Sequence, residues 1–133
     1  MKTVTIEETV AKQILAAPKK ALKSTYPKSN EGYAVALSTA SGKIYPGVSD
    51  ISDSQTLTMH SEATALERAA IHEIKDIVAI TGPNCHACKQ LLWESSLNSG
   101  IDIQIVTEVE QVIECTPISE LMPQPWPDKE GNK

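Results

Sequence analysis

Residues 59–73 read MHSEATALERAAIHE and place His60 and Glu62 at the start of an alanine-rich run. Apolar residues recur at helical spacing through this run, which predicts a helix over residues 60–74. Residues i and i+2 of a regular helix lie about 200° apart around its axis, so two such side chains cannot meet at one point. We therefore expect His60 to precede the first true turn of the helix.

A second polar cluster lies downstream in TGPNCHACKQLLWE, residues 81–94, where Cys85 and Cys88 have a C-x-x-C spacing. If a helix begins at this cluster, both sulfurs lie on one face of its first turn, where the helix dipole favours thiolates. A histidine and two cysteines are ligand types that Zn²⁺ accepts, and a catalytic zinc keeps a fourth position open. The sequence predicts that His60, Cys85 and Cys88 bind Zn²⁺, with Glu62 beside the open position to move protons.

Length and composition limit the protein class. A chain of 133 residues fits one domain over residues 1–133, with a Pro-rich and polar tail from about residue 124 that lies over the surface or frays. The net charge of −5 argues against a nucleic-acid polymer as partner and favours a small molecule. No apolar run approaches the ~20 residues that span a bilayer, and the first residues lack the apolar segment of a signal peptide. We expect no membrane partner and a cytoplasmic protein.

Hydrophobic periodicity along the chain alternates between helix and strand patterns. Pro18 is expected to kink or break the first helix. The alternation predicts an α/β fold, a three-layer α/β/α sandwich with a mixed sheet of about five strands, the first pair antiparallel and the central ones parallel. The predicted helices cover residues 5–24, 60–74 and 85–97, and the predicted strands cover residues 33–38, 43–48, 76–82, 101–107 and 111–115.

The H-x-E pattern followed by C-x-x-C resembles the cytidine deaminase family of zinc-dependent nucleoside and nucleobase deaminases. The resemblance runs from about residue 29 to residue 123 and includes GKIYPG (42–47), CKQLLWE (88–94) and ISELMPQPW (118–126). It implies zinc held by His60, Cys85 and Cys88, and Glu62 as the group that shuttles protons. It also implies hydrolytic removal of the amine from C4 of a 4-aminopyrimidine, as ammonia. Family members commonly complete each pocket with neighbouring subunits, so the resemblance implies a homotetramer or a homodimer.

The sequence departs from the family pattern where the substrate is held. The proline of the family motif stands one residue early, so that Asn84 precedes the first cysteine beside the leaving amine. Counting back from the H-x-E motif without gaps, the family's ribose-binding Asn and Glu fall at Ser49 and Ile51, and an aromatic position falls at Glu31. Together with Ser61, these residues are the predicted substrate contacts. Cytidine and deoxycytidine are therefore expected to be poor substrates compared with a free or differently substituted base.

Three kinds of function remain open from the sequence. The first is a deaminase, whose substrate is a cytidine-like nucleoside, a compound of the blasticidin S type, or another aminated heterocycle. In a non-catalytic zinc-binding fold, Cys115 or His86 would complete a closed metal site. A scaffold or binding module would keep the zinc but release no ammonia. A thioredoxin-like dithiol is disfavoured, because that motif follows an early strand and needs no H-x-E partner.

Overall fold

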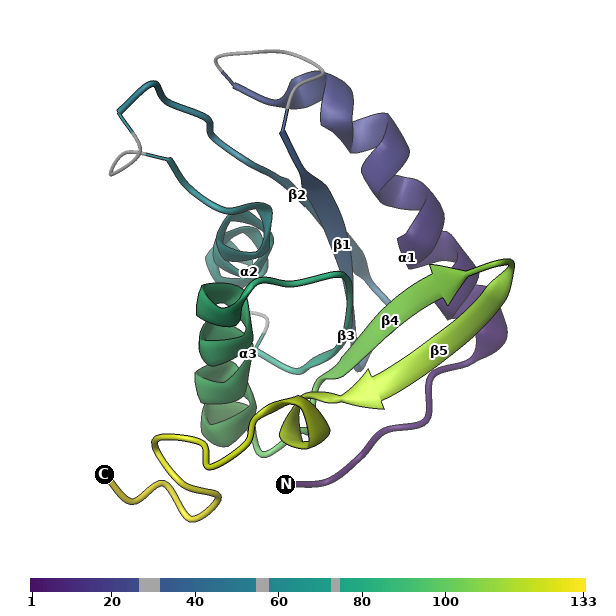
Figure 1. Cartoon of the computed structure of the whole chain (residues 1–133). Coiled ribbons are helices and arrows are strands. Elements are labelled where there is room, and N and C mark those ends of the chain that lie inside the picture. The colour runs from purple at the N-terminus through teal and green to yellow at the C-terminus, as the bar shows by residue number, and fades with distance from the viewer. Residues whose placement is uncertain (27–31, 55–57, 73–74) are drawn as a thin grey trace.

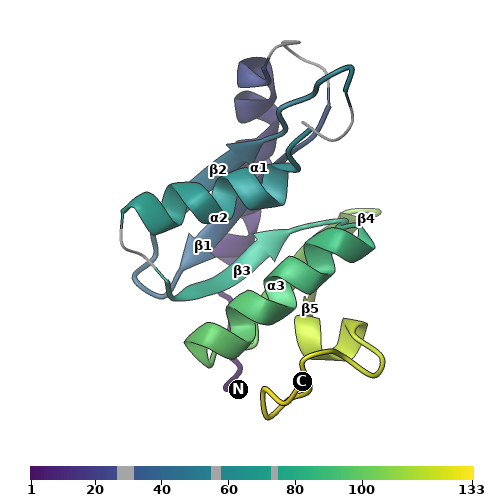
Figure 2. The ribbon, with the colours of Figure 1, turned by 90° about the vertical axis from the view of Figure 1, so that its left-hand side faces the viewer.

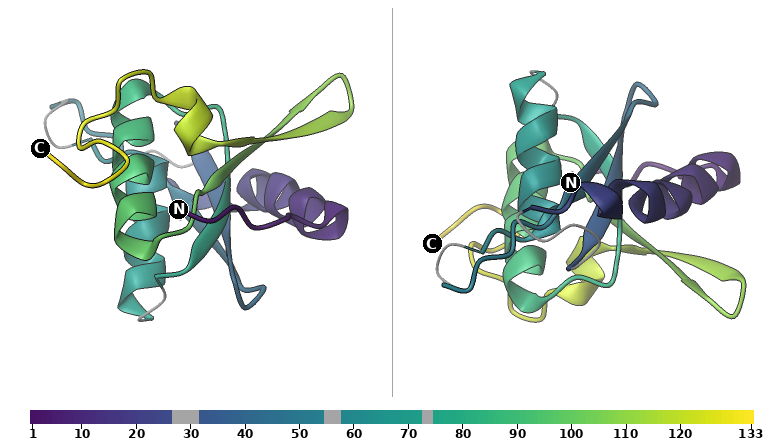
Figure 3. Two further views of the ribbon diagram at one scale, coloured as in Figure 1. Left: turned by 90° about the horizontal axis from the view of Figure 1, so that it is seen from below. Right: turned by 90° about the horizontal axis from the view of Figure 1, so that it is seen from above.

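The computed structural model describes residues 1–26, 32–54, 58–72 and 75–133. Its centre is one five-stranded sheet, with one helix on one face and two helices on the other, as predicted (Figures 1 and 3). The helices are α1 (Glu8–Ala21), α2 (Ser61–Ile71) and α3 (His86–Ser99), with 3-10 turns at Leu22–Ser24 and Ile118–Leu121. The strands are β1 (Ala34–Thr39), β2 (Ile44–Val48), β3 (Ile77–Thr81), β4 (Gln104–Val109) and β5 (Val112–Pro117).

The strand order is β2-β1-β3-β4-β5, and only the β3–β4 pair is parallel. The antiparallel first pair and the parallel β3–β4 pair are as predicted, whereas β1 and β3, which were also expected to be parallel, pair antiparallel. The reason is the order of connections. The β1–β2 hairpin reverses the chain, and the α2 crossover then leads from β2 to a strand that runs in the same direction as β2. Strands β2 and β3 therefore run in the same direction. Strand β1 lies between them and runs opposite to both.

Two apolar layers hold the sheet between the helices. Ala11 and Ile14 of α1 pack on one face, while Ala65 of α2 and Leu92 and Trp93 of α3 pack on the other. All five side chains are buried, and apart from Trp93 they are aliphatic. Figure 2 shows α2 and α3 side by side across the second face.

Gly47 of β2 allows α2 to lie directly on the edge of the sheet. A Cβ atom at this position would collide with the backbone nitrogen of Ala65 and the backbone oxygen of Ser61. Glycine is therefore required for close contact between strand and helix. The close contact fixes where α2 begins relative to the sheet.

For α1 and for the C-terminal segment, the sequence left two outcomes open. Pro18 does not end α1, which continues to Ala21, because only the last helical turn follows the proline and little of the hydrogen-bond ladder is lost. The C-terminal segment lies against α3. The indole nitrogen of Trp93 donates to the backbone oxygen of Pro127 (2.7 Å), and Gln90 donates to that of Trp126 (2.7 Å).

No helix among the described residues is both long enough and apolar enough to cross a bilayer.

Candidate metal and active site

Helices α2 and α3 begin at the same end of the sheet, where strand β3 finishes (Figure 2). His60 is the residue before α2, with extended backbone angles (φ −70°, ψ 147°), and Cys85 is the residue before α3 (φ −73°, ψ 171°). The prediction that His60 precedes the first turn is confirmed. The extended backbone turns the imidazole away from the helix axis, so that it faces the cysteines of the neighbouring helix.

The His60, Cys85 and Cys88 side chains form a compact cluster that could bind a metal ion. The Nδ1 atom of His60 lies 3.1 Å from the Sγ of Cys88 and 3.5 Å from the Sγ of Cys85, and the two sulfurs lie 3.5 Å apart. Ligands of a tetrahedral zinc with usual bond lengths are about 3.6–3.8 Å from one another. The donor types and their separations therefore fit Zn²⁺ with only small adjustments.

The cluster has three members among the described residues. The potential ligand atoms of His60, Cys85 and Cys88 all lie within 4.8 Å of one another, and no other described His, Cys, Asp or Glu belongs to the group. Cys115 lies exposed on β5, and His86 is not part of the cluster. Three protein ligands leave one position of a tetrahedral metal free, the arrangement typical of catalytic zinc.

Glu62 lies beside the cluster as a buried carboxylate with several hydrogen bonds. Its Oε1 accepts from the Ser61 hydroxyl (2.8 Å), and its Oε2 accepts from Nδ2 of Asn84 (2.9 Å). Burial alone would raise the pKa of Glu62, but the hydrogen bonds from Asn84, Ser61 and Cys88 outweigh it and hold the pKa below its usual value. The carboxylate is therefore ionised at neutral pH and able to accept a proton.

The pKa values of the two cysteines in the cluster are shifted in opposite directions. The backbone N–H of Cys88 lowers the pKa of the Cys85 thiol, and burial raises the pKa of the Cys88 thiol. The negative charge of Glu62 further disfavours a thiolate at Cys88. A metal binds the thiolate form of cysteine, so cation binding at this cluster would release the Cys88 proton.

A cavity of about 840 Å³ opens at the cluster and falls within the size range of small-molecule sites. Four predicted substrate contacts line it together with His60, Glu62 and Cys85. These contacts are Ser49, Ile51, Ser61 and Asn84. The fifth, Glu31, lies outside the described residues.

The end of the cavity away from the cluster is made by the segment after β2. The Oγ of Ser49 accepts a hydrogen bond from the backbone N–H of Tyr33 (2.9 Å), and Ile51 lies so close to Gly32 that a Cβ atom there would collide with its side chain. Thr58 and Met59 also line the cavity. Tyr33, Thr58 and Met59 were not anticipated, because no motif in the sequence links these separate segments to one cavity.

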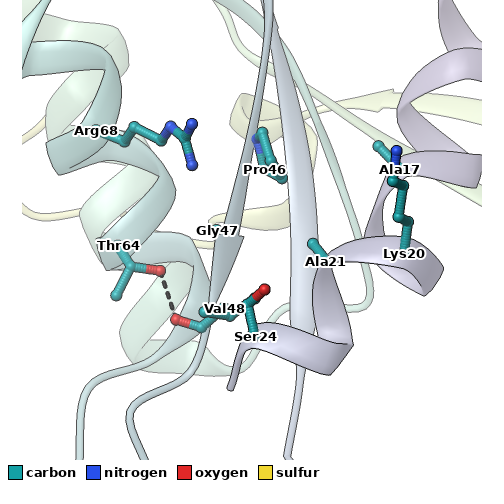
Figure 4. A pocket seen from close by; sticks show the side chains of 9 residues that line it. All are labelled: Ala17, Lys20, Ala21, Ser24, Pro46, Gly47, Val48, Thr64 and Arg68. Carbon is teal, nitrogen blue, oxygen red and sulfur yellow. Dashed lines mark hydrogen bonds between the residues drawn. The ribbon is translucent and has the colours of Figure 1, made fainter. Parts of the chain in front are cut away.

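A second, smaller cavity of about 490 Å³ lies between α1 and α2 over β2 (Figure 4). Lys20 and Arg68 stand on its two sides, and Thr64 donates a hydrogen bond to the backbone oxygen of Val48 (2.7 Å). The remaining lining is mostly small and apolar. Among the described residues, the lining of this cavity contains no carboxylate, histidine or cysteine, whereas the larger cavity contains all three.

Comparison with solved structures assigns the fold. No family model and no curated protein matches the sequence. The chain is similar to cytidine deaminase from Burkholderia pseudomallei (24% identity, TM-score 0.69), covering 92% of this chain and 100% of that one. It is also similar to the cytidine deaminases of Mycobacterium leprae (23%, TM-score 0.69, 85% and 97% covered) and Bacillus anthracis (20%, TM-score 0.66, 93% and 99% covered).

The protein therefore has the α/β/α fold of the cytidine deaminases, as the sequence resemblance implied. At these identities the similarity establishes the fold. The chemistry must be argued from the residues of this chain.

Proposed function

We propose that this protein is a zinc-dependent hydrolytic deaminase that acts on a 4-aminopyrimidine and releases ammonia. One observation carries the proposal: a three-ligand His–Cys–Cys cluster and a buried, ionised carboxylate meet at one end of a cavity of substrate size. The fold and the order of the motifs along the chain support the same reaction class.

His60, Cys85 and Cys88 would hold the zinc ion. Bound Zn²⁺ is a Lewis acid that makes water a stronger nucleophile at neutral pH. Glu62 accepts a proton from the attacking water and transfers it to the ring nitrogen next to C4. The new C–O bond forms at C4, and Glu62, again a carboxylate, takes the proton of the new C4 hydroxyl group. It passes this proton to the amine, the C4–N bond breaks, ammonia leaves, and the C4 oxygen becomes a carbonyl.

The substrate is proposed to be a cytosine-like ring with little dependence on ribose hydroxyl groups. Ser49 offers a hydroxyl that already accepts the Tyr33 N–H, and Ile51 offers only an apolar wall. A site without a buried amide and carboxylate gains little binding energy from the hydroxyl groups of a ribose. A compound of the blasticidin S type, with a different substituent on the ring, is an equally acceptable substrate beside the apolar Ile51 side chain.

Ammonia release from a panel of aminated heterocycles tests the proposal. The panel contains cytosine, cytidine, deoxycytidine, blasticidin S and adenine, each incubated with protein of measured zinc content. Release from at least one 4-aminopyrimidine, with loss of activity on zinc removal and recovery on zinc return, is the expected result. One zinc per chain with no release from any compound would favour a binding module instead.

Assembly and location stay predictions. A homotetramer is proposed because proteins of this fold commonly complete their pockets with neighbouring subunits, and a homodimer is the alternative. A monomer in light scattering would contradict both. A cytoplasmic location is proposed because the three cysteines are free, as is usual in a reducing compartment.

A further inference from the structure

Asn84 is the polar residue of the cavity whose role the proposed reaction leaves open. It lies in the turn between β3 and α3 and is only 8% exposed. Its Nδ2 donates to Oε2 of Glu62 (2.9 Å) and to the backbone oxygen of Thr81 (3.3 Å). Its Oδ1 is buried without a hydrogen-bond partner among the described residues. Both amide hydrogens are thus engaged within the protein.

The local structure is built to accept this amide. A Cβ atom at Gly82 would lie 3.1 Å from Oδ1 of Asn84 and 2.8 Å from Cγ2 of Ile105. Glycine at position 82 therefore provides the space in which the Asn84 side chain lies. The nitrogen of this amide makes its hydrogen bonds within the protein, whereas Oδ1 has no partner among the described residues.

The bond from Asn84 connects the two helix starts. Glu62 belongs to α2, and its Oε1 is held by Ser61 of the same helix. Asn84 precedes Cys85, the residue at which α3 begins. The Asn84 bond thus ties the second carboxylate oxygen to the segment that carries both cysteine ligands.

We infer that Asn84 is a positioning residue: through its Nδ2 it fixes the orientation of the Glu62 carboxylate relative to the metal ligands. The inference rests on the proposed function, because orientation matters only if Glu62 moves protons. The terminal torsion of a glutamate has a broad energy profile, so donors to both oxygens are needed to fix it. Proton transfer requires heavy atoms within about 2.6–3.2 Å, and a small displacement of the carboxylate lowers the rate.

The kinetic test compares Asn84→Ala with Asn84→Asp. Asn84→Ala should lower kcat by ~10-fold or more with KM changed by less than about threefold, as expected for loss of a positioned acid–base group. Asn84→Asp keeps the size but replaces the donor by an acceptor next to a carboxylate, so it should be at least as damaging as Ala. A space-filling role predicts the opposite order, and a substrate-contact role predicts a rise in KM. Either result would overturn the inference.

Asn98 supplies matched controls. It is exposed near the other end of α3, and Asn98→Ala and Asn98→Asp make the same chemical changes there. Both control variants should keep wild-type kcat, KM and zinc content. Zinc content should also be unchanged in Asn84→Ala, because the three ligands remain.

A crystal structure of zinc-loaded Asn84→Ala gives a readout that does not depend on activity. The expected result is a Glu62 carboxylate that is displaced or occupies more than one orientation, while His60, Cys85 and Cys88 keep their positions. A carboxylate in one unchanged orientation would overturn the inference. If the wild-type protein releases no ammonia from any substrate, the proposed function fails, and this structural comparison alone decides the role of Asn84.

Discussion

The two ends of the larger cavity are built in different ways. At the metal end, Glu62 and Cys88 are buried, His60 and Cys85 are exposed at the helix starts, and a hydrogen bond joins the starts of α2 and α3. At the outer end, Ile51 and Thr58 are only half-buried and lie in the segment between β2 and α2. The metal end therefore has one arrangement fixed by regular elements, whereas the outer end depends on loop structure. Chemistry is assigned to the first end and specificity to the second.

The largest expected effect is the loss of metal in Cys88→Ala. Loss of a supporting partner outside the ligand set already weakens a zinc site by ~10–100-fold, and loss of one of three protein ligands should exceed that. Metal analysis of protein purified without chelators should find one zinc per wild-type chain and far less in the variant. Cys115→Ala is the control, because Cys115 lies on β5 outside the cluster and should leave zinc content unchanged. Equal zinc in wild type and Cys88→Ala would show that the site is assigned wrongly.

The second prediction concerns Glu62. Glu62→Ala should lower turnover by ~10² or more while zinc content and folding stay intact, because a positioned acid–base group is lost. Glu62→Gln should be similarly inactive. Its amide oxygen can still accept a hydrogen bond from Asn84, but the side chain cannot accept a proton, so this variant distinguishes loss of proton transfer from loss of packing. Steady-state rates and circular dichroism measure both effects. Glu67→Ala, at an exposed position of the same helix, is the control. Turnover retained in Glu62→Ala would remove Glu62 from the mechanism.

The third prediction changes the outer end alone. Ser49→Asn combined with Ile51→Glu should raise kcat/KM for cytidine by ~10-fold or more, since hydrogen-bonding groups for a ribose are restored. Zinc content and activity on the free base should change little. The matched control is Ser49→Asn with Ile51→Leu, which alters the same positions without adding a carboxylate. If the unmodified protein already deaminates cytidine with kcat/KM in the ordinary ~10⁴–10⁸ M⁻¹s⁻¹ range, other residues hold the ribose.

The contrast between the two ends also explains what the sequence could predict. His60 and Cys85 were placed correctly at helix starts, because the spacing of a motif within one helix is fixed by helical geometry. The α/β/α layers followed from periodicity. The antiparallel β1–β2 pair and the parallel β3–β4 pair were also predicted. The orientation of β1 against β3 was not, since it depends on how the hairpin and the α2 crossover combine in space. The role of Asn84 was also hidden, because its bond to Glu62 depends on the space left by Gly82.

The smallest expected effect comes from the loop that forms the outer end. The Oγ1 of Thr58 accepts the backbone N–H of Ser52 (3.1 Å) and donates to the backbone oxygen of Ser52 (3.2 Å), which joins the two sides of the segment. Valine has the same shape but neither hydrogen-bonding function. Thr58→Val should therefore lower the free energy of unfolding by only about 0.5–1.5 kcal/mol per lost hydrogen bond, or less where water replaces the partner.

The kinetic consequence of Thr58→Val sharpens the comparison between the two ends. Because Thr58 lines the outer end only, the variant should raise KM by up to about threefold, the equivalent of roughly 0.7 kcal/mol. Its kcat and zinc content should equal those of the wild type. Thr9→Val, the same substitution at an exposed position of α1, should change none of these quantities. A fall in kcat with unchanged KM would mean that the loop and the metal end are mechanically coupled, and the division of the cavity into a chemical end and a specificity end would then be wrong.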